Sequence, residues 1–250
     1  MLIVAQQLLC IAAAVALSYL LTPVISEERL ITWPEFYLGP LAHVFGLPTA
    51  KRGDLVECDV YEYGDTRTEP YRRKMHLWLA ALLGATVPLL DLGRNPWGAA
   101  GLTVLAALFA HLATIDMGEK RLPHGLTALC TALALVIVGG SALSGFYPNP
   151  TQLLLQSAAG ALVVALTYRL MYRINPDKLG FGDVQMSMTV GLILGWGGLW
   201  PMLYGFGAAW FLQGSVSLVL WMFSVTSRKA MLPLGPAIVV TSFMTPLFLS

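Results

Sequence analysis

The chain is a series of long apolar runs, each separated from the next by a short polar or Gly/Pro-containing connection. A membrane-spanning helix needs about 20 apolar residues. Runs of roughly this length lie at residues 2–21, 75–91, 97–115, 125–146, 152–172, 184–198, 201–223 and 232–249. The second and the sixth are shorter than the rest. The pattern predicts an all-α polytopic membrane protein with about eight transmembrane helices.

The connection at residues 22–74 is long enough to form a small soluble domain. Within it, residues 55–63 alternate apolar and polar side chains, which favours a short strand. We therefore expect a first transmembrane helix at 1–21, a cytoplasmic loop domain at 22–74 and a transmembrane core at 75–250. The first run has no basic residue ahead of its apolar core, so we expect a retained helix rather than a cleaved signal peptide.

Composition supports a membrane protein, because 56% of the residues are hydrophobic and only 12% are charged. An average globular domain has about 25% charged residues. The formal net charge of +1 gives no indication of a nucleic-acid partner. Cys10, Cys58 and Cys130 form no CxxC pair and the four histidines form no HExxH motif, so we expect no bound metal.

Basic residues lie almost entirely in alternate connections. Fourteen of the 15 Lys and Arg residues fall in the first, third, fifth and seventh connections or at the adjoining helix ends, and Arg94 is the exception. Because cytoplasmic loops are enriched in Lys and Arg, both termini are predicted to lie outside. Asp116, opening the third connection, and Asp183, closing the fifth, are then expected at the same cytoplasmic membrane edge.

These two acids are candidate catalytic residues, because a carboxylate beside a hydrophobic helix is costly and usually marks a pathway or a reaction centre. Hydrolysis of an amide by water needs a base for the water and an acid for the carbonyl oxygen or the leaving nitrogen. Two neighbouring carboxyl groups that share one proton can supply both. Such a reaction requires no metal and no covalent nucleophile.

Charge placement alone leaves two other interpretations open. The acids could be ordinary interfacial residues that pair with Lys120, Arg121 or Lys178. They could also form the proton relay of a carrier, although carrier sites usually lie nearer the bilayer midplane than this edge.

Three motifs surround or follow the acids. Residues 115–127 read Ile-Asp-Met-Gly-Glu-Lys-Arg-Leu-Pro-His-Gly-Leu-Thr, with Pro123 seven residues after Asp116. Gly180-Phe181-Gly182-Asp183 is a GxGD motif, and Pro233-Leu234-Gly235-Pro236 is a P-x-G-P segment. In this order and spacing, over residues 75–250, the motifs resemble those of type IV prepilin peptidases.

The resemblance implies an aspartic protease of the bacterial inner membrane that removes the basic leader of prepilins or pseudopilins after a Gly, at the cytoplasmic face. Asp116 and Asp183 match the catalytic pair. Residues expected to shape the backbone around them are Gly180, Gly182, Pro123, Pro233, Gly235 and Pro236. The implied partners are the substrate and the lipid bilayer, with no cofactor. A pilus-assembly scaffold that binds prepilins without cutting them is an alternative.

The chain also departs from these peptidases at three places. Relatives often have Lys two residues after the second Asp and an acid after the Pro of the first motif, where this chain has Gln185 and His124. Neither change removes a catalytic group. Bifunctional relatives carry two cysteine pairs in the first loop, associated with zinc and N-methylation, whereas Cys58 stands alone there. We therefore predict a peptidase without a zinc site, and doubt that it methylates its product.

Overall fold

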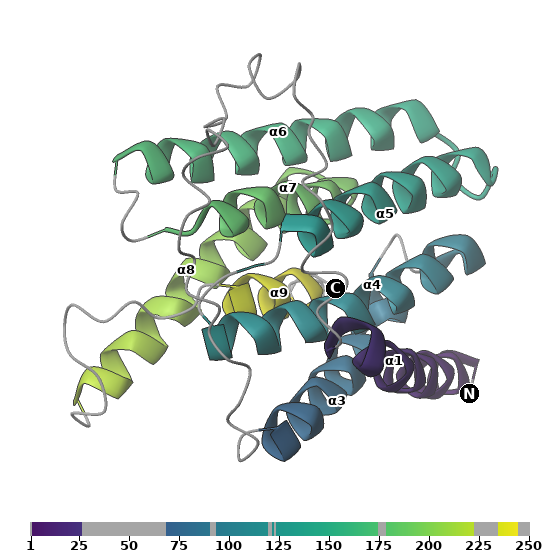
Figure 1. Ribbon diagram of the computed structural model, residues 1–250. Coiled ribbons are helices and arrows are strands. Elements are labelled where there is room, and N and C mark those ends of the chain that lie inside the picture. Colours follow the sequence, from purple (N-terminus) through teal and green to yellow (C-terminus); the bar gives the residue numbers. More distant parts are fainter. Residues whose placement is uncertain are drawn as a thin grey trace, which may run out of the picture.

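The computed structural model describes residues 2–26, 69–90, 94–119, 122, 124–174, 179–222 and 235–244. The secondary structure of this part of the chain is entirely helical, with no strand. The helices are α1 (Leu2–Ser26), α3 (Glu69–Thr86), the 3₁₀ turn η1 (Val87–Leu89), α4 (Pro96–Glu119), α5 (His124–Leu143), α6 (Pro150–Ile174), α7 (Phe181–Trp196), α8 (Leu199–Met222) and α9 (Gly235–Met244) (Figure 1). Each of the eight predicted runs overlaps one α-helix, which confirms the all-α prediction for the described residues.

Five of these helices are long and apolar enough to cross a membrane. Their spans are Val4–Thr22, Pro96–Asp116, Gly125–Leu143, Pro150–Ile174 and Leu199–Val219, and Met75–Leu89 is a shorter apolar helix. The chain is therefore a multi-pass membrane protein, and the count of eight spans stays a prediction. The strand predicted at residues 55–63 lies outside the described residues, as does most of the loop domain.

Several helices extend beyond the predicted apolar runs. α1 continues to Ser26 and α3 begins at Glu69, where Pro70 occupies a position in the first turn that suits proline. Near the candidate acids, α4 continues past the predicted run to Glu119, and α7 begins before the predicted run, at Phe181. An apolar run ends at the first polar residues, whereas backbone hydrogen bonding continues through them. Hydropathy therefore placed these helix ends too early or too late.

The two helices that carry the candidate acids lie at the centre of the bundle. In α4, 83% of the apolar span is buried, against at most 44% in the other four spans. α4 packs against α1, α3, α5 and α9, and α7 packs against α5, α6, α8 and α9 (Figure 1). A helix that is apolar on all sides is typical of such an enclosed position. Both acids are therefore held on helices surrounded by others.

Glycines allow α6 and α7 to pack backbone against backbone. A Cβ atom on Gly160 would lie 2.5 Å from the carbonyl oxygen of Gly191 and 2.8 Å from the Cα atom of Gly195. Neither distance leaves room for a side chain, and small residues are the usual means of close helix approach in membranes. This contact sets the position of α6 along α7.

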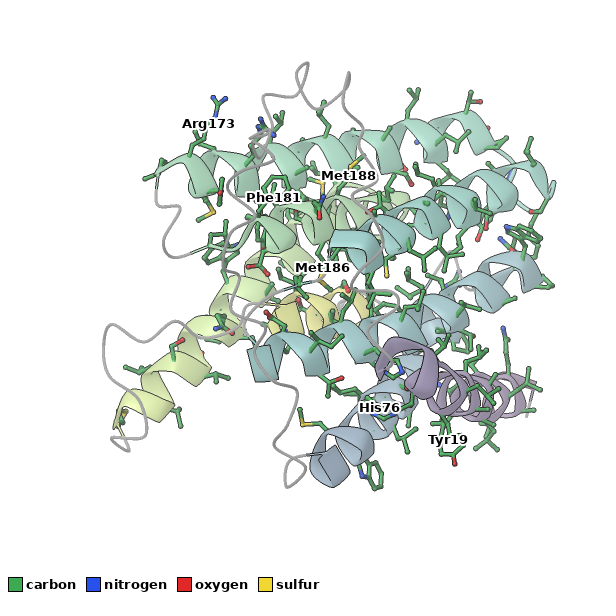
Figure 2. All side chains as sticks on the ribbon, in the orientation of Figure 1. Tyr19, His76, Arg173, Phe181, Met186 and Met188 are labelled. Carbon is green, nitrogen blue, oxygen red and sulfur yellow. The ribbon has the colours of Figure 1, made fainter. Side chains whose placement is uncertain are left out.

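Buried polar side chains join α1 to α3 and α4. Nε2 of His111 lies 2.9 Å from the backbone carbonyl of Ser18, and Nε2 of His76 lies 3.2 Å from Oγ1 of Thr22. The rings of His76, labelled in Figure 2, and His111 stack with centroids 4.6 Å apart. A carbonyl only accepts hydrogen bonds, so Nε2 of His111 carries a proton. The first helix is thus attached to the core by hydrogen bonds as well as by apolar packing.

Candidate active site

Asp183 lies in the first turn of α7. The Gly180 amide donates to Oδ2 of Asp183 over 3.2 Å, and the Asp183 amide donates to the Gly180 carbonyl over 3.1 Å. These reciprocal bonds have the form of a capping box, which begins a helix by satisfying backbone groups that have no partner inside it. We predicted that Asp183 would close the preceding connection. That placement was wrong, because the carboxylate itself helps to begin the helix.

Asp116 lies near the end of α4, inside the helix rather than in the connection that we predicted it to open. The helix continues past it to Glu119, which corrects that placement. Asp116 is 4% exposed and Asp183 is 8% exposed. The two carboxyl groups are also close enough to interact electrostatically. Two acids that are distant in sequence are thus buried near each other on different helices.

Gly182 explains how the segment after Asp116 reaches the start of α7. A Cβ atom on Gly182 would lie 2.5 Å from Cβ of Leu122 and 3.2 Å from the Leu122 carbonyl oxygen. Leu122 is 8% exposed and belongs to the connection between α4 and α5. Only a residue without a side chain lets this connection pack directly on α7. The second glycine of the GxGD motif therefore brings the two aspartate motifs together.

The first glycine of that motif has a different environment. A Cβ atom on Gly180 would have Oδ2 of Asp183, at 3.3 Å, as its neighbour within 4 Å. Its amide is also the donor to that oxygen. Gly180 therefore binds the acid itself, whereas Gly182 contacts the connection between α4 and α5.

Two hydrogen bonds between side chains hold α5 against α7 beside Asp183. Thr127 donates to Oε1 of Gln185 over 2.8 Å, and the hydroxyls of Thr131 and Thr189 lie 2.8 Å apart. In the sequence, Gln185 was notable only as a departure from related peptidases. The signal that could have found this contact is the matched i, i+4 spacing of the polar residues on both helices.

One oxygen of the candidate pair has no hydrogen bond to the described residues. Oδ1 of Asp183 is buried and has no partner there, while Oδ2 is bound by Gly180. Leaving a buried acceptor unsatisfied costs about 1–3 kcal/mol. Such an atom in a native fold often binds a water or a ligand. This oxygen is therefore in position to take part in chemistry.

Residues 103–226 match the sequence model of the type IV leader peptidase family. This match supports a family of the prepilin peptidase type. The matched segment runs from α4 past the end of α8 and includes both Asp116 and Asp183. The comparisons with curated proteins and with solved structures gave no significant match. The match confirms the resemblance seen in the sequence and supports a type IV leader peptidase activity in general.

The remaining predicted site residues lie outside the matched segment or outside the described residues. Pro123 and Pro233 fall in the second group. Gly235 and Pro236 begin α9, which packs against both α4 and α7. Within the described part of the chain, no group of three or more His, Cys, Asp or Glu side chains is arranged to hold a metal ion.

Proposed function

We propose that this protein is a membrane aspartic endopeptidase that uses Asp116 and Asp183 to remove the basic leader of type IV prepilins or pseudopilins. The observation that carries the proposal is the burial of both carboxyl groups, on separate helices, within electrostatic reach of each other. Oδ1 of Asp183 also supports the proposal, because this buried oxygen makes no hydrogen bond to the described residues.

The pair acts as base and acid in one step. One carboxylate takes a proton from a water molecule while the water oxygen bonds to the scissile carbonyl carbon, and the other carboxyl group donates its proton to the carbonyl oxygen. When the tetrahedral adduct collapses, the carboxyl group that took the water's proton passes it to the leaving nitrogen and the C–N bond breaks. A hydroxyl of the adduct returns its proton to the other carboxylate, so the pair again holds one proton. Two adjacent charges in a buried site repel each other, which favours this singly protonated state of the pair.

The predicted orientation of the chain supports this substrate class. The distribution of Lys and Arg predicts that the ends of α4 and α7 carrying the acids face the cytoplasm. A prepilin whose own hydrophobic helix lies in the inner membrane would place the leader junction, just after a Gly, at that edge. N-methylation of the product is doubtful, because Cys58 has no second cysteine in its loop.

Substitution of each aspartate by asparagine tests the proposal. Asn keeps the size of the side chain but cannot exchange the proton, and general acid–base catalysis contributes about 10²–10⁴-fold. Removal of the leader from a prepilin with a Gly–Phe junction should fall by at least that factor in Asp116→Asn and Asp183→Asn. Glu119→Gln and Asp177→Asn change neighbouring acids and should process the substrate normally.

Several outcomes would contradict the proposal. Normal processing by either Asn variant would show that the pair is not catalytic, and equal losses in the two control variants would show a general effect of charge. Binding of uncut prepilin by the unmodified protein would indicate a scaffold. Proton-coupled transport in proteoliposomes, without cleavage, would indicate a carrier.

A further inference from the structure

Tyr168 of α6 is a buried polar residue that the proposed chemistry does not use. It is 1% exposed. Its ring meets Phe206 edge to face, with centroids 5.8 Å apart, and is tilted against Trp210 at 5.7 Å. A tyrosine buried this deeply usually has a hydrogen-bond partner for its hydroxyl group.

The register of α6 on α7 places Tyr168 level with Asp183. Gly160 meets Gly191 through the backbone. The two helices run in opposite directions, and each rises about 1.5 Å per residue. Eight residues after Gly160 is Tyr168, and eight residues before Gly191 is Asp183, so the two lie at the same height. Tyr168 is also within electrostatic reach of Asp183.

A small cavity adjoins Tyr168 where α6, α7, α8 and α9 meet. Its volume of about 10 Å³ is close to what one water molecule needs. Tyr168, Ser187 and Thr241 line it among apolar residues. Ser187 follows Asp183 by four positions and so lies on the same face of α7.

The side chains around Tyr168 supply both a donor and an acceptor. Nε1 of Trp210 is buried within reach of the Tyr168 hydroxyl, and Oδ1 of Asp183 is buried without a hydrogen bond to the described residues. Ser187 donates its hydroxyl proton to the Val184 carbonyl over 2.7 Å, which leaves its oxygen able to accept. A hydroxyl that accepts from Trp210 and donates toward Asp183 would satisfy both atoms.

We propose that Tyr168 is a positioning residue for Asp183, with its hydroxyl accepting from Trp210 and donating toward Oδ1 of Asp183. Asp183 itself does not line the cavity, so a water molecule there acts one step back, by donating to the Tyr168 hydroxyl and to Oγ of Ser187, and two partners are within the usual range for a buried water. The network fixes the orientation of the carboxylate that faces the substrate. This inference rests on the proposed catalytic role of Asp183.

Tyr168→Phe tests it, because Phe keeps the ring contacts with α8 and removes only the hydroxyl. We expect kcat to fall roughly 10- to 100-fold, the range associated with one hydrogen bond to a charged group, while KM stays the same. Tyr172→Phe is the matched control, since Tyr172 lies one turn further along α6 with its ring against Phe181, labelled in Figure 2. That variant should retain the unmodified kcat.

Ser187→Ala is a second, independent test of the inference. It should also lower kcat, and the double variant with Tyr168→Phe should be no slower than the slower single variant, since both break the same chain of hydrogen bonds. Ser217→Ala is its control, because Ser217 on α8 likewise donates to a backbone carbonyl of its own helix, that of Gln213, over 2.7 Å.

An unchanged kcat in Tyr168→Phe would overturn the inference, as would multiplicative effects in the double variant or a fall in kcat that follows thermal stability. These results leave the catalytic role of Asp183 intact if Asp183→Asn is inactive. Cleavage by Asp183→Asn would instead overturn the proposed function.

Discussion

Replacing Gly182 with alanine is expected to separate activity from stability. The added Cβ atom would lie 2.5 Å from Cβ of Leu122, whereas ordinary contacts begin at 3.4 Å. Leu122 would therefore have to move away from α7 by roughly 1 Å. Because Leu122 belongs to the connection that follows Asp116, this movement would alter the position of one candidate acid relative to the other.

Two opposing terms decide the effect of Gly182→Ala on stability. Overpacking costs about 1–3 kcal/mol, and alanine recovers about 1 kcal/mol relative to glycine inside a helix. The free energy of unfolding should thus fall by only about 0–2 kcal/mol. A misplacement of about 1 Å at a reacting group can lower the rate about 10²-fold. The loss of activity should therefore exceed the loss of stability.

The assay is the initial rate of leader removal in detergent, measured beside the thermal unfolding midpoint. Gly139→Ala on α5 is the control, because Gly139 also lies inside a helix and its Cβ would meet nothing within 4 Å. Adding Leu122→Gly to Gly182→Ala removes the clashing atom and should restore part of the lost rate. Full activity in Gly182→Ala, or no recovery in the double variant with Leu122→Gly, would refute this reasoning.

Three further predictions concern the helix contacts around the site. Gly160→Ala should lower the unfolding midpoint by the equivalent of about 1–3 kcal/mol, because its Cβ would lie 2.5 Å from the Gly191 carbonyl. Gly207→Ala is the control, because a Cβ there meets nothing within 4 Å. Equal midpoints in the two variants would contradict the backbone contact. Thr127→Val should lower the free energy of unfolding by about 1–3 kcal/mol, because it removes the donor to Gln185. Thr167→Val on α6 is the neutral control. An unchanged melting curve in Thr127→Val would argue against this bond. His111→Leu should lower the free energy of unfolding by about 1 kcal/mol, because it removes the hydrogen bond to Ser18, and the cleavage site should stay the same. A shifted cleavage site on mass spectrometry would contradict a purely structural role.

Hydropathy predicted the helices well because each one carries an apolar surface, and in five of them this surface is long enough to cross the bilayer. It could not place their ends near the site. Asp183 begins α7 through its own side chain, and this depends on a reciprocal bond with Gly180 that hydropathy does not register. The acids therefore lie in the last turn of α4 and the first turn of α7, not in the connections.

The sequence pattern could not predict contacts between helices that are far apart in the sequence. His76 and His111 stack between α3 and α4, and Tyr168 lies level with Asp183, yet each is a single polar residue in an apolar run. Their partners are set by how the helices pack. The GxGD glycines were recognised as a motif, but the role of Gly182 became apparent only from its contact with Leu122.

Mass spectrometry of a prepilin incubated with the purified protein and S-adenosylmethionine tests the central claim most directly. The account predicts a single new N-terminus immediately after a Gly, without an added methyl group, and an intact prepilin with Asp116→Asn or Asp183→Asn. An uncut prepilin, a cut elsewhere in the chain, or the same cut by either variant would contradict it.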